Sequence, residues 1–130
     1  MQVPSLASSP STGTLVESLP GYGSLTSLGF RLLSGTVTAS PQGQHPVRTL
    51  FYAIAESQRS PATDPVVLWQ TGGPGCSGIS AFWWEHGPFT MAAPQNINNP
   101  EGFPSITLNP FSWNRVATVI YMDSPWWVVL

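Results

Sequence analysis

The run Thr71-Gly72-Gly73-Pro74-Gly75 is the part of the sequence best suited to chemistry, and it follows directly on Val66–Trp69 and Gln70. A strand that ends in glycines exposes backbone N–H groups at the carboxyl edge of a sheet, where ligands bind in open α/β sheets. Glycine has no Cβ, so a reacting group can approach these N–H groups closely. Such a bend can act as an oxyanion hole for a carbonyl oxygen that gains negative charge. It can also be a tight turn between a strand and a helix, and the Gly-Gly-Pro-Gly residues alone favour the turn.

Four other residues outside this run have side chains that could take part in chemistry. Cys76 is the only cysteine, so it is either an inert buried thiol or half of a disulfide whose partner is elsewhere. Residue count alone favours the buried thiol. Taken alone, Glu85 is an ordinary surface charge at a helix end, and His86 occupies the last turn of that helix, where a cation is favoured. His45 lies in a proline-flanked loop and has no assigned role.

The glycine run needs a strand before it and a helix after it. Val66–Trp69 is a short apolar run, typical of a strand buried on both faces. Ser77 can cap a helix that continues to about His86, and this helix has so few polar residues that it should be largely buried. The other predicted elements are an antiparallel strand pair over residues 30–39 and 48–56, a surface loop over 92–110 and a buried strand over 116–122.

This order of elements predicts the opening of an α/β sheet: an antiparallel hairpin, then strand, glycine loop, helix and strand. Such a sheet is incomplete, because both of its faces need cover and the chain supplies cover for one at best. We therefore expect exposed apolar faces on the strands over residues 66–69 and 116–122. Residues 1–18 indicate a polar, flexible lead, residues 19–125 the folded part, and residues 126–130 a separate tail.

The composition also indicates that this chain leaves part of its apolar surface uncovered. Charged residues make up only 8% of the 130 residues, where a soluble domain usually carries about 25%. We infer that part of the apolar surface packs against something outside the chain. The net charge of −2 excludes the basic footprint of a nucleic-acid-binding protein. No stretch approaches the ~18 consecutive apolar residues of a membrane span, and no secretory signal is visible at the N-terminus.

Several segments, in this order and spacing, closely resemble the serine carboxypeptidase family. They are Leu19-Pro20-Gly21-Tyr22, Phe51-Tyr52 with Glu56-Ser57, residues 65–78, Glu85-His86-Gly87-Pro88-Phe89, residues 109–114 and residues 120–125. The resemblance implies an incomplete α/β-hydrolase fold and the release of C-terminal residues from peptides at acidic pH. It also implies acyl transfer through a Ser-His-Asp triad, a peptide C-terminus as partner, and neither a cofactor nor a metal ion.

The resemblance also assigns roles to individual residues. The N–H of Gly73 is the second donor of the oxyanion hole, and the N–H of Gly72 helps to hold the terminal carboxylate of the substrate. Glu85 matches a glutamate that pairs with another carboxyl group near the carboxylate site, where one of the two keeps its proton. Thr71 stands where the family usually has an asparagine that binds the same carboxylate. Cys76 matches a cysteine that forms a disulfide with a residue far downstream.

The sequence departs from the family at three places. Thr71 replaces that asparagine, and threonine is frequent there in the acyltransferase branch, which moves an acyl group from a sugar ester to an alcohol. Residues 126–130 replace a glycine-containing stretch. No Gly-x-Ser-x-Gly nucleophile elbow occurs, so the whole triad is expected beyond residue 130.

We therefore expect a fragment of a serine-type carboxypeptidase that has no catalytic residue of its own and is inactive alone. The first alternative is a fragment of a sugar-ester acyltransferase of the same family, with Thr71 as the discriminating residue. The second is a non-catalytic binding or regulatory protein that offers its tryptophans and sheet edges to a partner. Family members usually enter the secretory pathway and reach the vacuole or the extracellular space.

Overall fold

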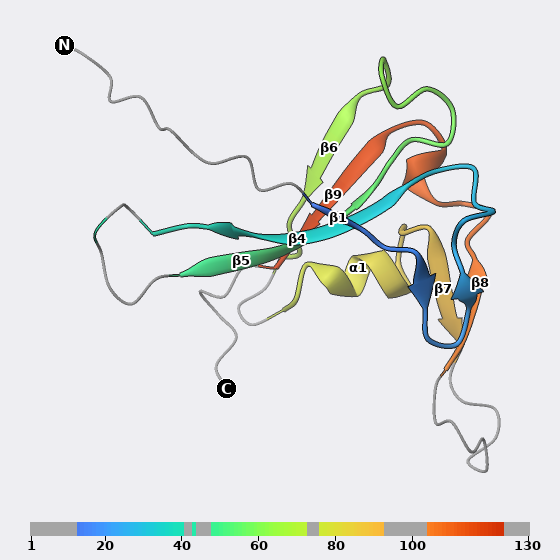
Figure 1. Ribbon diagram of the computed structural model, residues 1–130, viewed down its shortest axis with the longest axis horizontal. Coiled ribbons are helices and arrows are strands. Elements are labelled where there is room, and N and C mark those ends of the chain that lie inside the picture. Colours follow the sequence, from blue (N-terminus) through green and yellow to red (C-terminus); the bar gives the residue numbers. More distant parts are fainter. Residues whose placement is uncertain (1–12, 41–42, 44–47, 73–75, 93–103, 124–130) are drawn as a thin grey trace.

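The computed structural model describes residues 13–40, 43, 48–72, 76–92 and 104–123. Its centre is one mixed five-stranded sheet (Figure 1). The strand order is β1 (Thr14–Leu15), β4 (Leu32–Thr38), β5 (Thr49–Ala55), β9 (Thr118–Met122) and β6 (Val66–Trp69). Two small hairpins flank it, β2 (Ser18–Leu19) with β3 (Gly23–Ser24), and β7 (Phe89–Ala92) with β8 (Ser105–Leu108). The helices are α1 (Ile79–Trp84) and the short 3-10 helix η1 (Trp113–Arg115).

The predicted antiparallel strand pair is confirmed as β4 and β5. Their register runs from Leu32 opposite Ala55 to Thr38 opposite Thr49. Tyr52 of β5 lies across Gly35 of β4, where an added Cβ would stand only 2.6 Å from the tyrosine oxygen. A residue without a side chain is therefore needed at this crossing, and it lets the Tyr52 ring lie buried against the sheet.

Strand β9 lies between the β4–β5 hairpin and β6, the strand that precedes the glycine run. It pairs antiparallel with β5 and parallel with β6, so β6 and β9 end at the same edge of the sheet. Val119 and Tyr121 of β9 are fully buried on the side of α1. Phe82 of α1 contacts the Tyr121 ring at 5.3 Å between centroids and the Phe89 ring at 5.9 Å. These aromatic contacts form the centre of the core and fix the helix on the sheet.

The helix is shorter and more exposed than the sequence predicts. It ends at Trp84, not near His86, because the N–H groups of Glu85, His86 and Gly87 all turn back to the carbonyl of Ala81. A Cβ on Gly87 would stand 1.9 Å from the Phe82 carbonyl oxygen, so this tight reversal requires glycine. Only Ala81 and Phe82 are buried, whereas Trp84 is 63% exposed. The prediction of a largely buried helix is therefore wrong.

Two segments predicted to be irregular contain short strands. Residues 14–15, inside the predicted flexible lead, pair with β4, and residues 89–92 and 105–108 pair with each other as β7 and β8. The prediction of a surface loop over 92–110 is thus wrong at its ends, because the flanking Phe89 and Ile106 pack against the core. Residues 93–103, like residues 1–12 of the lead and the tail from residue 124, lie outside the described part.

The two faces of the sheet are covered unequally, as the incomplete sheet predicts. Figure 1 shows α1 on one side of the sheet only. On the other side, Val66 and Leu68 of the edge strand β6 are 64% and 55% exposed. On β9 the same prediction holds only in part, because Ile120 and Met122 are partly exposed whereas Thr118, Val119 and Tyr121 are buried. No helix within the described ranges is long and apolar enough to span a membrane.

Candidate functional site

Thr71 and Gly72 lie just beyond the carboxyl end of β6, where the sequence places them. A Cβ added to Gly72 would meet no atom of the described residues within 4 Å, so these residues leave open space beside this peptide group. The Thr71 side chain is half-buried, and its Oγ1 accepts a hydrogen bond of 3.2 Å from the indole N–H of Trp69. The hydroxyl proton of Thr71 remains available for donation to a further acceptor. Gly73, the predicted oxyanion-hole donor, lies outside the described residues.

The chain on the far side of the glycine run is anchored to the end of β9. The hydroxyl of Ser77 donates to the carboxylate of Asp123, and the N–H of Ile79 donates to Ser77 Oγ over 3.2 Å. Ser77 thus bonds the first turn of α1 as predicted, although the capping position itself is Gly78. A Cβ on Gly78 would stand 1.9 Å from the Met122 carbonyl oxygen. Close contact between α1 and β9 therefore requires glycine at this position.

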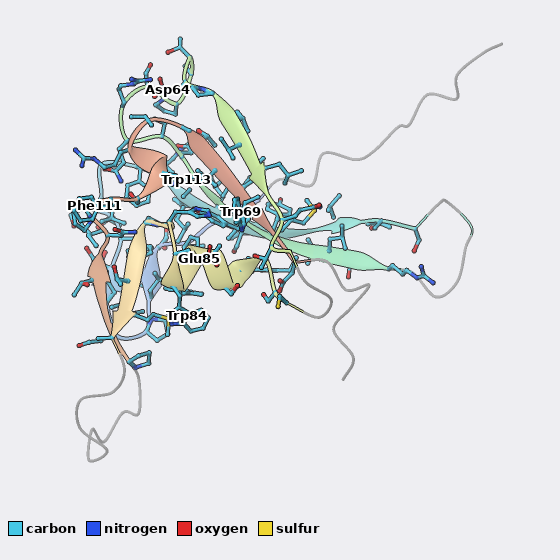
Figure 2. The ribbon with its side chains drawn as sticks, turned by 180° about the vertical axis from the view of Figure 1, so that it is seen from behind. Asp64, Trp69, Trp84, Glu85, Phe111 and Trp113 are labelled. Carbon is cyan, nitrogen blue, oxygen red and sulfur yellow. The ribbon has the colours of Figure 1, made fainter. Side chains whose placement is uncertain are left out.

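Trp69 belongs to a cluster of four rings, in which the other three are His86, Trp113 and Tyr121. The His86 ring stacks on Trp113 with 4.0 Å between centroids and meets Trp69 edge-on at 4.4 Å. Figure 2 shows Trp69 and Trp113 next to each other, and their centroids are 5.5 Å apart. These contacts hold the indole whose N–H meets Thr71, so the aromatic cluster indirectly positions the Thr71 hydroxyl.

His86 is a buried member of this cluster. Its Nδ1 lies 3.3 Å from the Tyr121 hydroxyl, and its buried Nε2 has no hydrogen-bond partner within the described part of the chain. Burial lowers the pKa of His86, against a smaller opposing effect of the Glu85 carboxylate, and burial raises the pKa of Tyr121. The prediction that His86 sits as a favoured cation in the last helical turn is therefore wrong.

Glu85 and Cys76, the other predicted site residues, are both exposed. Glu85 directly follows α1, and its neighbour His86 touches Trp69, so Glu85 and Thr71 are linked to the same aromatic cluster. The thiol of Cys76 is free and is not the inert buried group favoured by residue count. The pairing of Glu85 with another carboxyl group and the disulfide of Cys76 both stay predictions.

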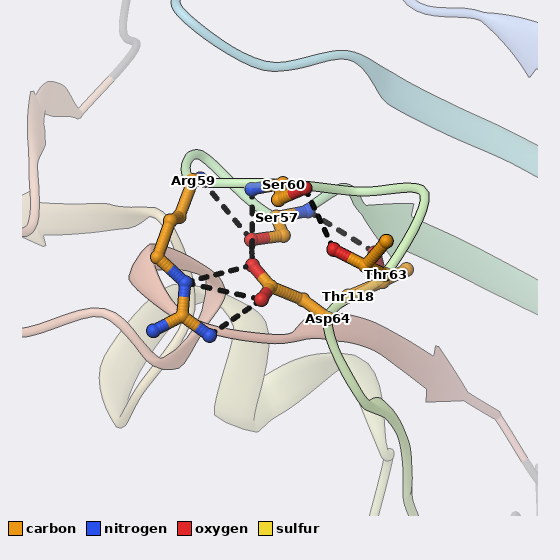
Figure 3. A network of polar contacts seen from close by, with 6 residues as sticks. All are labelled: Ser57, Arg59, Ser60, Thr63, Asp64 and Thr118. Atoms are coloured by element: carbon orange, nitrogen blue, oxygen red, sulfur yellow. Dashed lines mark hydrogen bonds and ion pairs between the residues drawn. The ribbon is translucent and has the colours of Figure 1, made fainter.

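A polar network that the sequence does not point out fixes the loop before β6 (Figure 3). The carboxylate of Asp64 accepts hydrogen bonds from Ser57 Oγ at 2.6 Å, from the Ser60 N–H at 3.0 Å and from the Arg59 guanidinium. The Arg59 and Ser57 hydrogen bonds lower the pKa of Asp64 to about 2. Buried Ser57 also accepts from the Arg59 N–H, and its own N–H donates to Thr118 of β9. No imidazole takes part in these bonds, so the network is a loop anchor and not an activated nucleophile.

Comparison with known proteins identifies the protein family. The family described as serine carboxypeptidase matches residues 20–128 of this chain. The chain belongs to the serine carboxypeptidase family. Among individual relatives, serine carboxypeptidase 1 of Hordeum vulgare is 44% identical over 114 residues, which are 87% of this chain and 21% of the relative. Serine carboxypeptidase-like 20 of Arabidopsis thaliana is 42% identical over 112 residues, 85% of this chain and 21% of the relative.

The crystal structure of a prohormone-processing carboxypeptidase from Saccharomyces cerevisiae has the same arrangement of elements. It superposes with a TM-score of 0.57 at 20% identity, over 74% of this chain and 19% of that one. The sheet and helix of this chain are therefore part of an α/β-hydrolase fold, as the resemblance implies. The chain spans about a fifth of the length of the relatives that it matches.

Family membership gives a context for the positions of Thr71 and Gly72. In this chain, Thr71 and Gly72 follow β6 at the edge where α/β sheets bind ligands. The structure adds three residues that the sequence alone does not single out for the site: Trp69 as the partner of Thr71, and Ser77 with Asp123 as the anchor beyond the glycines. Ser77 has a sequence signal as a helix cap, whereas its contact with Asp123, 46 positions away, is invisible in a local pattern.

Proposed function

We propose that this chain supplies the substrate-carboxylate site and the second oxyanion-hole donor of a serine-type carboxypeptidase. The observation that carries the proposal is the pair Thr71 and Gly72 at the end of β6, with space beside Gly72 that no described residue fills and a hydroxyl oriented by the Trp69 indole. The ligand is the C-terminal carboxylate of a peptide. Gly73 lies next in the chain, and its N–H is assigned to the oxyanion that forms on the scissile carbonyl.

The roles of the two described residues follow from their hydrogen-bonding capacity. A carboxylate is acceptor-only, so the site needs donors. The Gly72 N–H is one. Thr71 is the other, because the Trp69 N–H occupies a lone pair of its oxygen and leaves the O–H for the ligand. Glu85 is assigned to the same site as one member of a carboxyl pair, the second member coming from a part of the protein outside this chain.

A chimera tests the proposal. Residues 20–123 replace the matching segment of the barley relative, and hydrolysis of a blocked dipeptide is followed. We expect hydrolysis, and we expect Thr71→Val to lower kcat/KM by roughly tenfold to a hundredfold, since a hydrogen bond to a charged group contributes ~1.5–3 kcal/mol. Thr107→Val, an exposed site on β8, is the matched control. Equal activity of both variants would remove Thr71 from the site.

Thr71 also supports a second candidate function, that of a sugar-ester acyltransferase. A threonine here offers one short hydroxyl where the carboxypeptidase pattern has an amide. The same chimera decides between the two when a glucose ester and an alcohol are supplied in place of the peptide. Transfer without peptide hydrolysis favours the acyltransferase, and Thr71→Asn should then shift activity toward the peptide.

The separate chain of 130 residues is expected to be inactive on its own. It carries no Gly-x-Ser-x-Gly elbow, and without a triad only the small effect of binding and oxyanion donors could remain. Turnover of a blocked dipeptide by the purified chain would contradict this. A vacuolar or extracellular destination through the secretory pathway accompanies the carboxypeptidase proposal. A purely regulatory role would require partner binding without any contribution to catalysis.

A further inference from the structure

Two adjoining clefts lie at the edge of the sheet where β9 begins. The Arg115 cleft, named after the arginine of η1 that lines it, has a volume of about 480 Å³. The Arg31 cleft, named after the arginine that precedes β4, has a volume of about 600 Å³. Residues 28–30 and Gln58 line both clefts, so the two adjoin each other. Gln58 lies beyond the end of β5, which is antiparallel to β9, and Arg115 lies shortly before β9, so both clefts belong to this edge.

Three of the four arginines of the chain line these clefts, and they differ in what they bind. Arg31 and Arg59 each form an ion pair with a neighbouring carboxylate. Arg115 has no carboxylate partner within the described residues and donates one N–H to the Pro110 carbonyl oxygen over 2.8 Å. This bond fixes the side chain, and the other N–H groups of the guanidinium remain available to a ligand. Arg115 is therefore the cation in the two clefts that can receive an anion.

The acidic residues give such a ligand a direction. Glu17 and Glu56 both line the Arg31 cleft, whereas the residues that line the Arg115 cleft include no acid. A negatively charged head group is repelled by the two carboxylates and attracted by the guanidinium. The head group is therefore favoured at Arg115, and the Arg31 cleft is left for an uncharged part of the same ligand.

The wall that the two clefts share is mostly apolar. Leu28 and Phe30 are half-buried and pack against the core. Gly29 lies between them, and a Cβ at this position would meet no atom of the described residues within 4 Å. The missing side chain leaves room for a chain of methylene groups to pass from one cleft into the other. Further apolar residues line the Arg31 cleft beyond this point: Leu15, Val16, Leu25, Leu32 and Pro61.

We propose that the two clefts together bind an amphipathic carboxylate, with its head group on Arg115 and its alkyl chain along residues 28–30 into the Arg31 cleft. A planar guanidinium can donate parallel hydrogen bonds to both oxygens of a carboxylate. One unpaired arginine also matches the single charge of a carboxylate better than the double charge of a phosphate. Thr71 and Gly72 follow the opposite end of β6, so this ligand site is separate from the proposed substrate site and does not depend on it.

Binding of dodecanoate to the 130-residue chain tests the proposal. Isothermal titration calorimetry at neutral pH, below the concentration at which micelles form, should show one saturable site. Arg115→Gln should weaken binding by roughly tenfold or more, because the charge-assisted hydrogen bonds to the carboxylate are lost. Arg48→Gln is the matched control, since Arg48 lines neither cleft. Equal weakening by the two variants, or the absence of saturable binding, overturns the proposal.

Variation of the ligand separates the contributions of its head and its tail. Dodecylammonium, with the same tail and a positive head, should bind roughly tenfold more weakly than dodecanoate or worse, and equal affinity would overturn the assignment of the head to Arg115. Octanoate should also bind at least about tenfold more weakly, because each buried methylene group strengthens binding roughly threefold to fourfold. Equal affinity of octanoate and dodecanoate would show that the tail does not reach the Arg31 cleft.

A substitution at Gly29 tests the path of the tail. Gly29→Leu places a side chain in the space that the two clefts share and should weaken dodecanoate binding by roughly tenfold. Gly29 is not among the glycines with positive φ, so the fold should tolerate the change, and thermal unfolding of the variant without ligand checks this. Unchanged binding by a folded Gly29→Leu variant would overturn the proposed path. No peptide is present in these measurements, so their outcome is independent of the proposed carboxypeptidase function.

Discussion

The two faces of the central sheet have similar aliphatic character and opposite environments. On the side of α1, Leu32, Ala55 and Val119 pack against Phe82 and become part of a closed core. On the other side, no helix of the described residues covers the sheet, and Leu15 and Leu68, at its two edges, are about half exposed. The comparison shows that burial here is decided by which face receives the helix and not by residue type. The stability of the chain should therefore depend almost wholly on one face.

The largest expected effect is at the centre of the covered face. Phe82→Ala removes a ring that contacts Phe89, Trp83 and Tyr121, and should lower the free energy of unfolding by about 3–5 kcal/mol. Because this approaches the full stability of many small domains, the variant should lose its cooperative transition in chemical denaturation. Trp84→Ala, on the same helix but exposed, should change the free energy by about 0.5 kcal/mol or less. Similar losses for both would show that α1 is not docked as described.

The next largest loss of stability is expected where α1 meets the end of β9, beside the glycine run. In Gly78→Ala the new Cβ would meet the Met122 carbonyl oxygen at 1.9 Å, so α1 must move away from β9, with a loss of about 2–3 kcal/mol. In Gly72→Ala the new Cβ meets no atom of the described part of the chain within 4 Å, and Gly72 is not among the glycines with positive φ, so the stability of this variant should be unchanged within about 0.5 kcal/mol. Thermal unfolding of the two variants measures the difference. A tolerated alanine at residue 78 would contradict the anchor.

The sequence predicts the elements of this chain better than their limits. The apolar run Val66–Trp69 and the alternation in β5 are local signals, and both strands form where expected. The early end of α1 depends on Gly87 packing against the Phe82 carbonyl, and the β7–β8 pair depends on contacts across residues 93–103 in the sequence. Neither follows from periodicity. For the site, the motif places Thr71 and Gly72, whereas the Trp69 and Asp123 contacts come only from the packed structure.

Strongly acidic pH should affect the loop that precedes the edge strand. The pKa of Asp64 is lowered from 3.8 to about 2 by its hydrogen bonds, so its contribution to stability is complete above about pH 4 and is lost as pH falls toward 2. Asp64→Asn should therefore be less stable than the parent at pH 6 and approach it near pH 2. Glu17→Gln, outside this network, is the control. Parallel pH profiles for Asp64→Asn and the parent would show that the network does not hold the loop.

Mildly acidic pH should act on the covered face through His86. Burial lowers its pKa in the folded chain, so the unfolded chain takes up a proton first, and stability falls as pH drops below the unfolded value of about 6.5. His86→Gln should flatten this part of the pH profile, whereas His45→Gln, which changes the other histidine, should leave it unchanged. Tryptophan fluorescence gives an independent readout, because Trp69 and Trp113 touch the His86 ring. A profile that His86→Gln leaves unaltered would place the acid-sensitive group elsewhere.

The smallest expected effect is that of Leu68→Ala on the open face, compared with Leu32→Ala on the covered face. Leu32→Ala on the covered face should lower the free energy of unfolding by about 2–5 kcal/mol, because Leu32 is buried in the core. Leu68→Ala on the open face removes the same atoms, but Leu68 is 55% exposed, so the loss should be about 0.5 kcal/mol or less. Comparable losses for the two variants would show that the two faces of the sheet are covered alike.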